Sequence, residues 1–308
     1  MPSDQRRPPS GAGLAERFQA HRDRLFGVAY RMLGTVTDAE DVLQDAWLRW
    51  SSAGRDEVAD DEAYLVRVTT NLALDRLTSA RAKREQYIGP WLPEPLLTSP
   101  DAAEHVEVAE SVSTALLVVL ETLTPLERAV FVLREAFGFP YTEIAAVLGR
   151  SEASVRQVGT RARKHVDARR PRFDPRADER RAAVDRFLEA AVGGDINELM
   201  AVLAPDVALW TDGGGKVRAP LRVIHGPEKI ARFFLGIIGR PWQGVPVGEW
   251  TISWAEINGE PGLILEGGGR VLGTIGVTTD EDGLISTVHM VGNPDKLHAV
   301  RAGRTFDG

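Results

Sequence analysis

Cysteine is absent from this chain of 308 residues, which excludes disulfide bonds, iron–sulfur clusters and zinc sites built on thiolates. Long apolar runs are absent as well. The longest, residues 115–120, is far too short to cross a bilayer, so we expect a cytoplasmic protein with no membrane partner. Residues 1–13 contain no apolar segment and are predicted to be a disordered tail, not a signal peptide. We expect no cofactor and no metal site.

The net charge is −7, which taken alone argues against a nucleic-acid partner. The charges are unevenly distributed, however. Between residues 150 and 172 there are eight lysine and arginine side chains against only Glu152 and Asp167, and acids outnumber bases after residue 182. Because a local basic patch binds phosphate whatever the total charge of the chain, this patch outweighs the overall sign.

Residues 142–164 have the spacing of a helix, a tight turn and a second helix. Ala145 is small where two helices must cross, Gly149 provides the turn, and Val155 packs the second helix onto the first. Ser151 is the expected N-cap. The alternative is an ordinary helix pair with a solvated basic face, but packing residues and basic face occur together here, which favours DNA binding. The side chains expected to contact DNA are Arg156, Gln157, Thr160, Arg161, Arg163 and Lys164.

Residues 14–86 have apolar side chains at helical spacing and predict three helices. The second begins after Thr37, the expected cap, and carries acids that suit a helix N-terminus. These carboxylates, which form either a docking surface for a basic partner or a solvated face, are Asp38, Glu40, Asp41 and Asp45. Trp47 and Trp50 are either stacking platforms or core, and their helical spacing favours core. The third helix, residues 62–86, ends in a basic stretch; its polar positions include Asn71, Arg76, Arg81 and Arg84.

The second half of the chain changes in character. Residues 87–122 are predicted to be a linker with one weak helix, and the prolines in residues 91–95 impose an extended, rigid conformation there. The helix-turn-helix module is expected to cover residues 123–172, and Thr124-Pro125-Leu126-Glu127 predicts the start of one of its helices. Residues 178–297 contain helices followed by four strand-like runs, which predicts an α+β domain with a cone-like pocket; residues 298–308 are expected to be a tail.

Several motifs resemble those of a known protein family. The stretches at 29–34 and 38–47 resemble region 2 of the extracytoplasmic-function sigma factors, and those at 123–128 and 141–145 resemble their region 4. The part after residue 178 looks like a SnoaL-like domain of the nuclear-transport-factor-2-like fold. Within this family, the SigJ-like branch combines all three parts. The signature motifs of that branch are found here at residues 91–95, 212–216 and 293–297.

The resemblance implies a sigma factor with two all-α domains and a C-terminal regulatory domain. Such a protein binds core RNA polymerase and directs transcription initiation at promoter DNA. Region 2, through its polar third-helix residues, would read the −10 element; region 4 would read the −35 element; the acidic helix would contact polymerase. The linker, if extended, could reach roughly 120 Å at ~3.3 Å per residue. Promoter elements about 17 base pairs apart are separated by roughly 58 Å, so both modules can bind one promoter.

The C-terminal domain is expected to act in place of a separate anti-sigma protein. We expect its motifs at residues 212–216 and 293–297 to contact region 2 or the linker around residues 91–95. The residues expected to form this regulatory contact are Trp91, Pro93, Glu94, Pro95, Asp212, Gly213, Gly214, Gly215, Lys216, Asn293, Pro294, Asp295 and Lys296.

An enzymatic C-terminal domain is the alternative, because the same fold houses small isomerases and hydrolases. All four tyrosines precede residue 142, which rules out an oxyanion hole built on tyrosine there, and residues 212–216 lack the spacing of a phosphate-binding loop. The remaining candidate acids and bases are Asp206, Asp212, His225, Glu266 and His289. The histidines are isolated and are expected to be structural, so we predict a regulator and not an enzyme.

The C-terminal pocket is the expected place for a small-molecule ligand. Aromatic residues that either line it or belong to the plain core are Trp210, Phe233, Trp242, Trp250 and Trp254. A second alternative for the whole chain is a ligand-responsive DNA-binding regulator that never touches polymerase. That reading explains the helix-turn-helix but leaves the acidic helix and the 62–86 helix without a function. A third is a SnoaL-like enzyme fused to a DNA-binding module.

Overall fold

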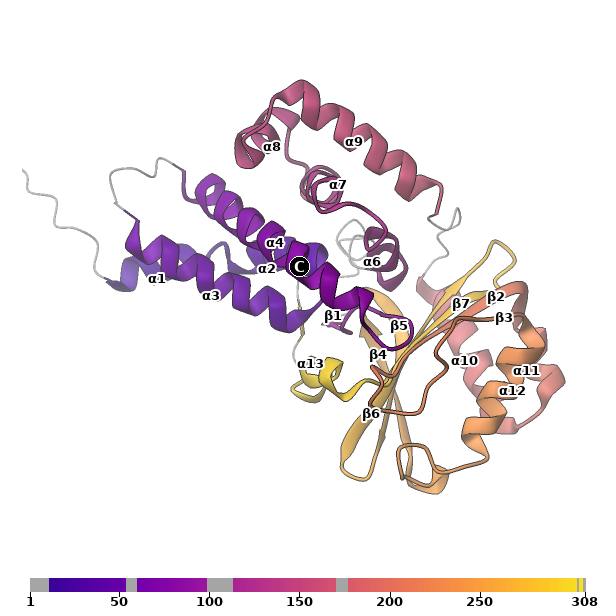
Figure 1. Cartoon of the computed structure of the whole chain (residues 1–308). Coiled ribbons are helices and arrows are strands. Elements are labelled where there is room, and N and C mark those ends of the chain that lie inside the picture. The colour runs from indigo at the N-terminus through magenta and orange to yellow at the C-terminus, as the bar shows by residue number, and fades with distance from the viewer. Residues whose placement is uncertain (1–10, 54–59, 99–112, 170–176, 304, 307–308) are drawn as a thin grey trace, which may run out of the picture.

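The computed structural model describes residues 11–53, 60–98, 113–169, 177–303 and 305–306. Helices make up the first half of the chain, and a curved sheet with helices packed against it makes up the second half (Figure 1). The two predicted fold classes, all-α and then α+β, are therefore both present. In the described part of the chain, none of the helices has the length and hydropathy needed to cross a membrane.

The first helical part contains α1 (Gly11–Gln19), α2 (Arg22–Leu33), α3 (Val36–Ser52) and α4 (Asp61–Glu85). The first helix starts inside the predicted 1–13 tail. Helix α2 ends at Gly34, which adopts a left-handed conformation with φ of 72°. Gly34 and Thr35 separate α2 from α3, and the Thr35 hydroxyl accepts a hydrogen bond from the Asp38 amide at 3.3 Å. The cap is thus Thr35, and the predicted cap Thr37 lies in the first turn.

The two tryptophans of α3 belong to the core. Trp50 is only 3% exposed, and its ring lies 5.7 Å from that of Tyr64 on α4. Trp47 packs edge-to-face on Phe18 of α1, with ring centroids 5.3 Å apart. Trp50 is therefore closed to a nucleotide base, and Trp47, which is half-buried, packs against the same core, as the helical spacing of the two favoured.

The second helical part contains α7 (Pro125–Phe131), the π-helical turn η2 (Val132–Ala136), α8 (Tyr141–Leu148) and α9 (Glu152–Asp167). Thr124 and Glu127 form the predicted capping box at the start of α7. Helix α8 ends at Gly149 with φ of 62°, and Ser151 caps α9. Ile144 and Val155 are fully buried between the two helices, so α8 and α9 form the helix-turn-helix that the spacing predicted.

The segment between the two helical parts connects them and also contributes a strand to the sheet. It contains β1 (Leu97–Thr98) and α6 (Thr114–Leu120). Leu97 pairs antiparallel with Ile257 of β4 and parallel with Thr305 of β8. The sequence predicted a weak helix in this segment but not a strand, because a two-residue strand has no periodicity of its own.

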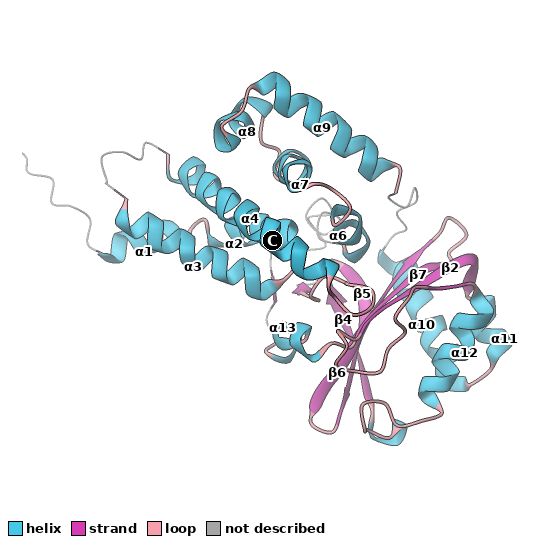
Figure 2. Cartoon of the chain, in the orientation of Figure 1, coloured by secondary structure: helices cyan, strands magenta, loops and turns pink. Residues whose placement is uncertain are grey.

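The C-terminal domain has helices α10 (Ala177–Gly193), α11 (Ile196–Ala201) and α12 (Pro227–Ile238) on one face of the sheet (Figure 2). Its own strands are β2 (Leu203–Asp212), β3 (Ile224–His225), β4 (Thr251–Ile257), β5 (Glu260–Gly267), β6 (Arg270–Thr279), β7 (Ile285–Val291) and β8 (Thr305–Phe306). The order across the sheet is β3-β2-β7-β6-β5-β4-β1-β8. Strands β2 and β7 are parallel, and the pairs from β7 to β1 are antiparallel.

The two faces of the sheet pack against different parts of the chain. One face forms the domain core with α10, α11 and α12. The other forms a smaller cluster in which Val291 and Leu297 surround the linker residue Leu92. The end of the chain belongs to this second cluster: after the turn η4 (Pro294–Lys296) comes α13 (His298–Arg301), where Val300 is buried. The region expected to be a tail, residues 298–308, therefore contains a packed helix and β8.

Candidate functional sites

The outer face of α9 is an exposed basic surface. All six side chains expected to contact DNA, from Arg156 to Lys164, are exposed. Arg156 lies over the ring of Tyr141, 5.0 Å from its centroid, and pairs with Glu152 one turn earlier. Tyr141 reaches this position because residue 159 is glycine: a Cβ there would lie 2.8 Å from the tyrosine hydroxyl. The geometry leaves a row of cationic and amide groups open to a major groove.

The acidic face of α3 is joined to α4 by one arginine. Arg76 lies 2.8 Å from a carboxylate oxygen of Asp41 and 3.6 Å from carboxylate oxygens of Asp38 and Asp45. The Glu40 carboxylate instead contacts Arg22 at 2.7 Å. The four carboxylates remain 32–50% exposed, so a basic partner can still reach them. Three carboxylates of the acidic helix and Arg76 of the predicted DNA site thus form one ion-pair network.

The remaining α4 residues of the predicted DNA site have different environments. Asn71 is half-buried. The side chain of Arg81 lies outside the described residues. Arg84 is 15% exposed, pairs with Glu121, donates to the carbonyl of Leu33 and lies 3.9 Å from the centroid of the Trp91 ring. The Arg84 guanidinium is thus engaged inside the protein in this arrangement, and its contact with a DNA strand stays a prediction.

A buried carboxylate of the C-terminal domain binds the linker. Asp212, at the end of β2, is 1% exposed. Its Oδ1 accepts a hydrogen bond from the Tyr87 hydroxyl at 2.5 Å, and its Oδ2 accepts one from the Leu92 amide at 2.9 Å. Lys296 lies 2.7 Å from Oδ2 and also donates to the Leu92 carbonyl. We call this group, Tyr87, Leu92, Asp212, Asn293 and Lys296, the clasp.

The clasp lysine lies between aromatic rings. Its Nζ is 4.0 Å from the ring centroid of Trp91 and 4.9 Å from that of Tyr87. The Trp91 ring therefore makes cation–π contacts with two cations, Lys296 and Arg84. Burial lowers the pKa of Lys296 to about 8, and the attraction of Asp212 opposes that shift. The clasp thus joins the C-terminal domain, the linker and α4.

The two C-terminal motifs meet at this point. The side-chain Nδ2 of Asn293 donates to the Tyr87 hydroxyl at 2.8 Å, and the backbone amide of Asn293 donates to the carbonyl of Asp212 at 2.9 Å. Gly214 has φ of 59°, and a Cβ there would lie 2.2 Å from the Asn293 side chain, so any larger residue would separate the motifs. Lys216 and Asp295 form an exposed ion pair across the same two turns. The other predicted residues of these two turns are Gly213, Gly215 and Pro294.

The linker motif also caps a helix of the first part. Residues 92–96, which include Pro93 and Pro95, are all buried. The Glu94 carboxylate accepts hydrogen bonds from the amides of Val36 at 2.8 Å and Thr37 at 3.4 Å, which are the free donors at the start of α3. Its other oxygen, Oε1, finds no partner within the described residues. Burial raises the pKa of Glu94. The favourable helix dipole at this end of α3 partly offsets the cost of burying the charge.

A second contact between the domains lies at the β4–β5 turn. Asn258 is 1% exposed and adopts a φ of 54°. Its Oδ1 accepts from the Leu96 amide at 2.7 Å, its amide donates to the Leu96 carbonyl at 2.7 Å, and its Nδ2 donates to the Tyr30 hydroxyl at 2.9 Å. Tyr30 in turn donates to the carbonyl of Glu94 at 2.7 Å. The Asn258-Gly259 pair is typical of a tight turn, but no local signal points to the partner of Asn258 on α2.

Comparison with known proteins identifies the two helical parts. Residues 17–83 match the family model of sigma-70 region 2, and residues 113–166 match that of sigma-70 region 4. The chain is 40% identical over 293 residues to the ECF RNA polymerase sigma factor SigJ of Mycobacterium tuberculosis, covering 91% of this chain and 92% of SigJ. This chain belongs to the extracytoplasmic-function sigma factors. It is an RNA polymerase sigma factor.

The resemblance extends over all three parts of this sigma factor. The crystal structure of SigJ matches with a TM-score of 0.72 at 38% identity, covering 92% of this chain and 98% of that chain. A protein described as probable ECF RNA polymerase sigma factor SigI, also from Mycobacterium tuberculosis, is 33% identical over 94% of this chain and 96% of its own length. The SnoaL-like C-terminal domain is therefore part of the family resemblance and not a separate addition.

The contact of Glu94 with α3 leads to a testable prediction for this sigma factor. Glu94→Ala removes the acceptor for two helix amides and is expected to lower the free energy of unfolding by about 1–2 kcal/mol. Glu94→Gln keeps a carbonyl acceptor without the buried charge and is expected to change it by less than about 1 kcal/mol. Urea denaturation of the two variants at neutral pH measures the difference. Equal losses in both would mean that the charge, and not the acceptor, matters.

The raised pKa of Glu94 predicts a pH dependence of stability in the unaltered protein. The folded protein holds a proton on Glu94 more tightly than the unfolded chain, whose carboxyl has the ordinary pKa of 4.5. The contribution of Glu94 to stability is therefore largest below pH 4.5 and declines as the pH rises through the raised folded pKa. The Glu94→Gln protein should lack this decline. The free energy of unfolding of the unaltered protein, compared with that of Glu94→Gln, should therefore fall as the pH rises from 4 to neutral.

Proposed function

We propose that the C-terminal domain regulates this sigma factor in cis by holding the linker against region 2. The observation that carries the proposal is the buried carboxylate of Asp212, which belongs to the C-terminal domain but accepts its hydrogen bonds from the linker residues Tyr87 and Leu92. Removing one partner of a buried ion pair costs several kcal/mol. A contact of this kind is strong enough to hold one arrangement of the domains, and its release would change that arrangement.

The clasp is connected to the contact between regions 2 and 4. Arg128 of α7 is 1% exposed, donates to the carbonyl of Arg31 on α2 at 2.9 Å and pairs with Glu121. Glu121 also pairs with Arg84, the residue stacked on Trp91 of the linker. Region 2, region 4 and the linker therefore meet around one carboxylate. In the structure α4 of region 2 packs on α7 and α8 of region 4, and we call this the closed arrangement. We propose that the clasp stabilises it by holding Trp91 in place.

Promoter geometry supports this role. Elements about 17 base pairs apart are separated by roughly 58 Å, whereas α4 of region 2 packs directly on α7 and α8 of region 4. The two regions must separate before they can bind both elements of one promoter. In our proposal region 2 then reads the −10 element and α9 reads the −35 element, while the carboxylates of α3 contact core polymerase. No separate anti-sigma protein is required, because the C-terminal domain already restrains the linker.

The lack of cysteine allows a direct test with two spin labels. Ser79 on α4 and Ala153 on α9 are both exposed, and each can be replaced by cysteine in the full chain. We expect one short label distance in the free protein. Adding Lys296→Met should shift part of the population toward the roughly 58 Å that separates the promoter elements, because it removes the cation of the clasp. The distance between the two labels is measured by pulsed electron paramagnetic resonance.

Two controls make that measurement decisive. Lys216→Met removes the exposed pair with Asp295 in the same two turns and is expected to leave the distance unchanged, because exposed pairs contribute little. Labels at Ala153 on α9 and at Ala168, the exposed residue that caps the end of this helix, should report a constant distance throughout. If Lys296→Met and Lys216→Met give the same distances, the clasp does not hold the closed arrangement and the proposal fails.

We further propose that the C-terminal domain is not an enzyme. Asp206, His225 and Glu266 are exposed at the surface, and Asp212 is occupied by the clasp. His289 is buried, and burial lowers its pKa to about 4, so it stays neutral and structural. None of these five lines the apolar cavity beneath α10 and α12, so in the part of the chain that the structure describes that cavity has no acid or base.

A further inference from the structure

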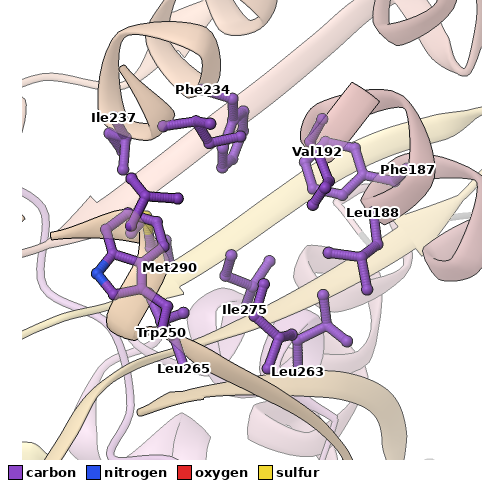
Figure 3. A pocket seen from close by; sticks show the side chains of 14 residues that line it. Phe187, Leu188, Val192, Phe234, Ile237, Trp250, Leu263, Leu265, Ile275 and Met290 are labelled. Carbon is purple, nitrogen blue, oxygen red and sulfur yellow. The ribbon is translucent and has the colours of Figure 1, made fainter. Parts of the chain in front are cut away.

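The C-terminal domain encloses an apolar cavity of about 270 Å³ between two helices and the sheet (Figure 3). Phe187 of α10 and Phe234 of α12 point into it from the helices, and Leu263, Ile275 and Met290 point into it from β5, β6 and β7. Of the aromatic residues that the sequence suggested for this pocket, Trp250 lines it; Phe233 and Trp242 line a separate small recess beside Asp212, and Trp210 and Trp254 line neither.

The wall of the cavity offers no hydrogen-bonding side chain to a ligand. All fourteen residues that line it are apolar or aromatic. The one side-chain N–H among them, Nε1 of Trp250, already donates to the carbonyl of Val245 at 3.0 Å. A ligand with a charge or an unpaired polar group would lose its hydration on entry without regaining a partner. The wall therefore selects against charged and strongly polar molecules.

The size of the cavity limits the ligand further. A protein cavity of about 150 Å³ lined by leucine, isoleucine and phenylalanine stays dry and binds benzene. The cavity here is nearly twice as large, which at the same filling suits a molecule of about ten carbons. Access is provided at the mouth by Val192 and Ile252, which are 62% and 37% exposed although they line the cavity.

The cavity and the linker share the same strands. Side chains alternate between the two faces of a strand, and Leu263 and Leu265 of β5 line the cavity while Ile264 between them packs in the cluster around Leu92. On β7 Met290 faces the cavity, and its neighbour Val291 packs in that same cluster. A molecule that filled the cavity would press on the sheet whose opposite face carries the linker.

We propose that this cavity binds one uncharged, apolar small molecule of about ten carbons and that its occupancy is transmitted through β5 and β7 to the linker. The binding itself is independent of the proposed regulatory function, whereas the transmission rests on it. The ligand class is an unsubstituted or weakly polar hydrocarbon, either a fused ring or a compact branched skeleton.

Naphthalene and 2-naphthoate form the matched pair of probes. They share the ring system, and only the second carries a charge. In the full chain labelled at methionine methyl groups, naphthalene is expected to shift the Met290 signal saturably, while Met32 in the region 2 core does not move. We expect 2-naphthoate to bind at least about a hundredfold more weakly, because its carboxylate meets no partner. Equal binding of both probes, a shift at Met32 instead of Met290, or no saturable shift would overturn the proposal.

A cavity-filling variant provides an independent check. Ala191 of α10 lines the cavity, and Ala191→Phe is expected to abolish the naphthalene shift; Leu221→Ala, at an exposed position outside the cavity, should not. If Ala191→Phe does not unfold cooperatively, the probe pair in the unaltered chain still decides. Transmission is measured by hydrogen exchange of the Leu92 amide, which should change at least threefold with naphthalene. Binding without that change overturns the transmission alone, and the spin-label experiment, made without ligand, tests the clasp separately.

Discussion

Replacing Asp212 by alanine is expected to lower the free energy of unfolding by about 3–5 kcal/mol, the largest loss for any side chain of the clasp. Three donors lose their acceptor together: the Tyr87 hydroxyl, the Leu92 amide and the Lys296 ammonium. Lys296 is only 6% exposed and would be left as a buried cation without its carboxylate. The measurement is urea denaturation of the full chain, with hydrogen exchange of the linker amides as a local probe.

The matched control for this prediction is Asp295→Ala. Asp295 also pairs with a lysine in the same two turns, but that pair is more than half exposed on both sides, so its loss should cost less than about 1 kcal/mol. A double variant, Asp212→Leu with Lys296→Met, removes both buried charges and should recover part of the stability lost in the single variant. If Asp212→Ala and Asp295→Ala were equally stable, the clasp would not hold the domains together.

Removing Arg156 or Arg161 from α9 is expected to reduce transcription from a promoter of this sigma factor at least about tenfold. Both side chains are exposed on α9, and each lost contact to a base edge costs about 1–3 kcal/mol. The measurement is in vitro transcription with core polymerase, each arginine being replaced by alanine in the full chain. Base preference at the −35 element should relax along with the rate.

Arg232 provides a close control for the loss of one positive charge. Like Arg156, it is exposed and pairs with a glutamate one turn earlier in its helix, but it lies on α12 of the C-terminal domain. Arg232→Ala should therefore leave transcription unchanged. Unaltered −35 preference in both the Arg156 and the Arg161 variants would show that α9 does not read the element through these residues.

The features that the sequence predicted correctly depend on residues close together in the chain. Ser151 caps α9 because its hydroxyl accepts from the amide of Ser154, three residues on, and Thr124 and Glu127 cap α7 in the same way. The four strand-like runs likewise predicted β4, β5, β6 and β7 of the C-terminal domain. Such signals can be read from sequence because both partners lie within one turn or one strand.

The roles of individual charged residues were harder to predict. Arg84 stands in the same basic stretch of sequence as the other arginines and lysines at the end of α4. Its side chain nevertheless pairs with Glu121, 37 residues further along the chain. Arg76 looked like a DNA contact and is held by carboxylates of α3. Whether an arginine faces solvent or another helix depends on how helices pack, and no local pattern records that.

The sequence alone determined the helix-turn-helix, the helices of residues 14–86 and the α+β class of the third domain, because capping and periodicity are local properties. The role of the first helical part and the motifs that meet the linker were expected from the resemblance to the family. Only the tertiary structure decided that Leu97 adds a strand to the sheet and that Asn258 bonds Tyr30 across 228 positions of sequence. It also decided that Asp212 is buried with Lys296. These contacts join residues whose separation in the chain is far beyond any helical or strand period, so they exist only once the domains are packed together.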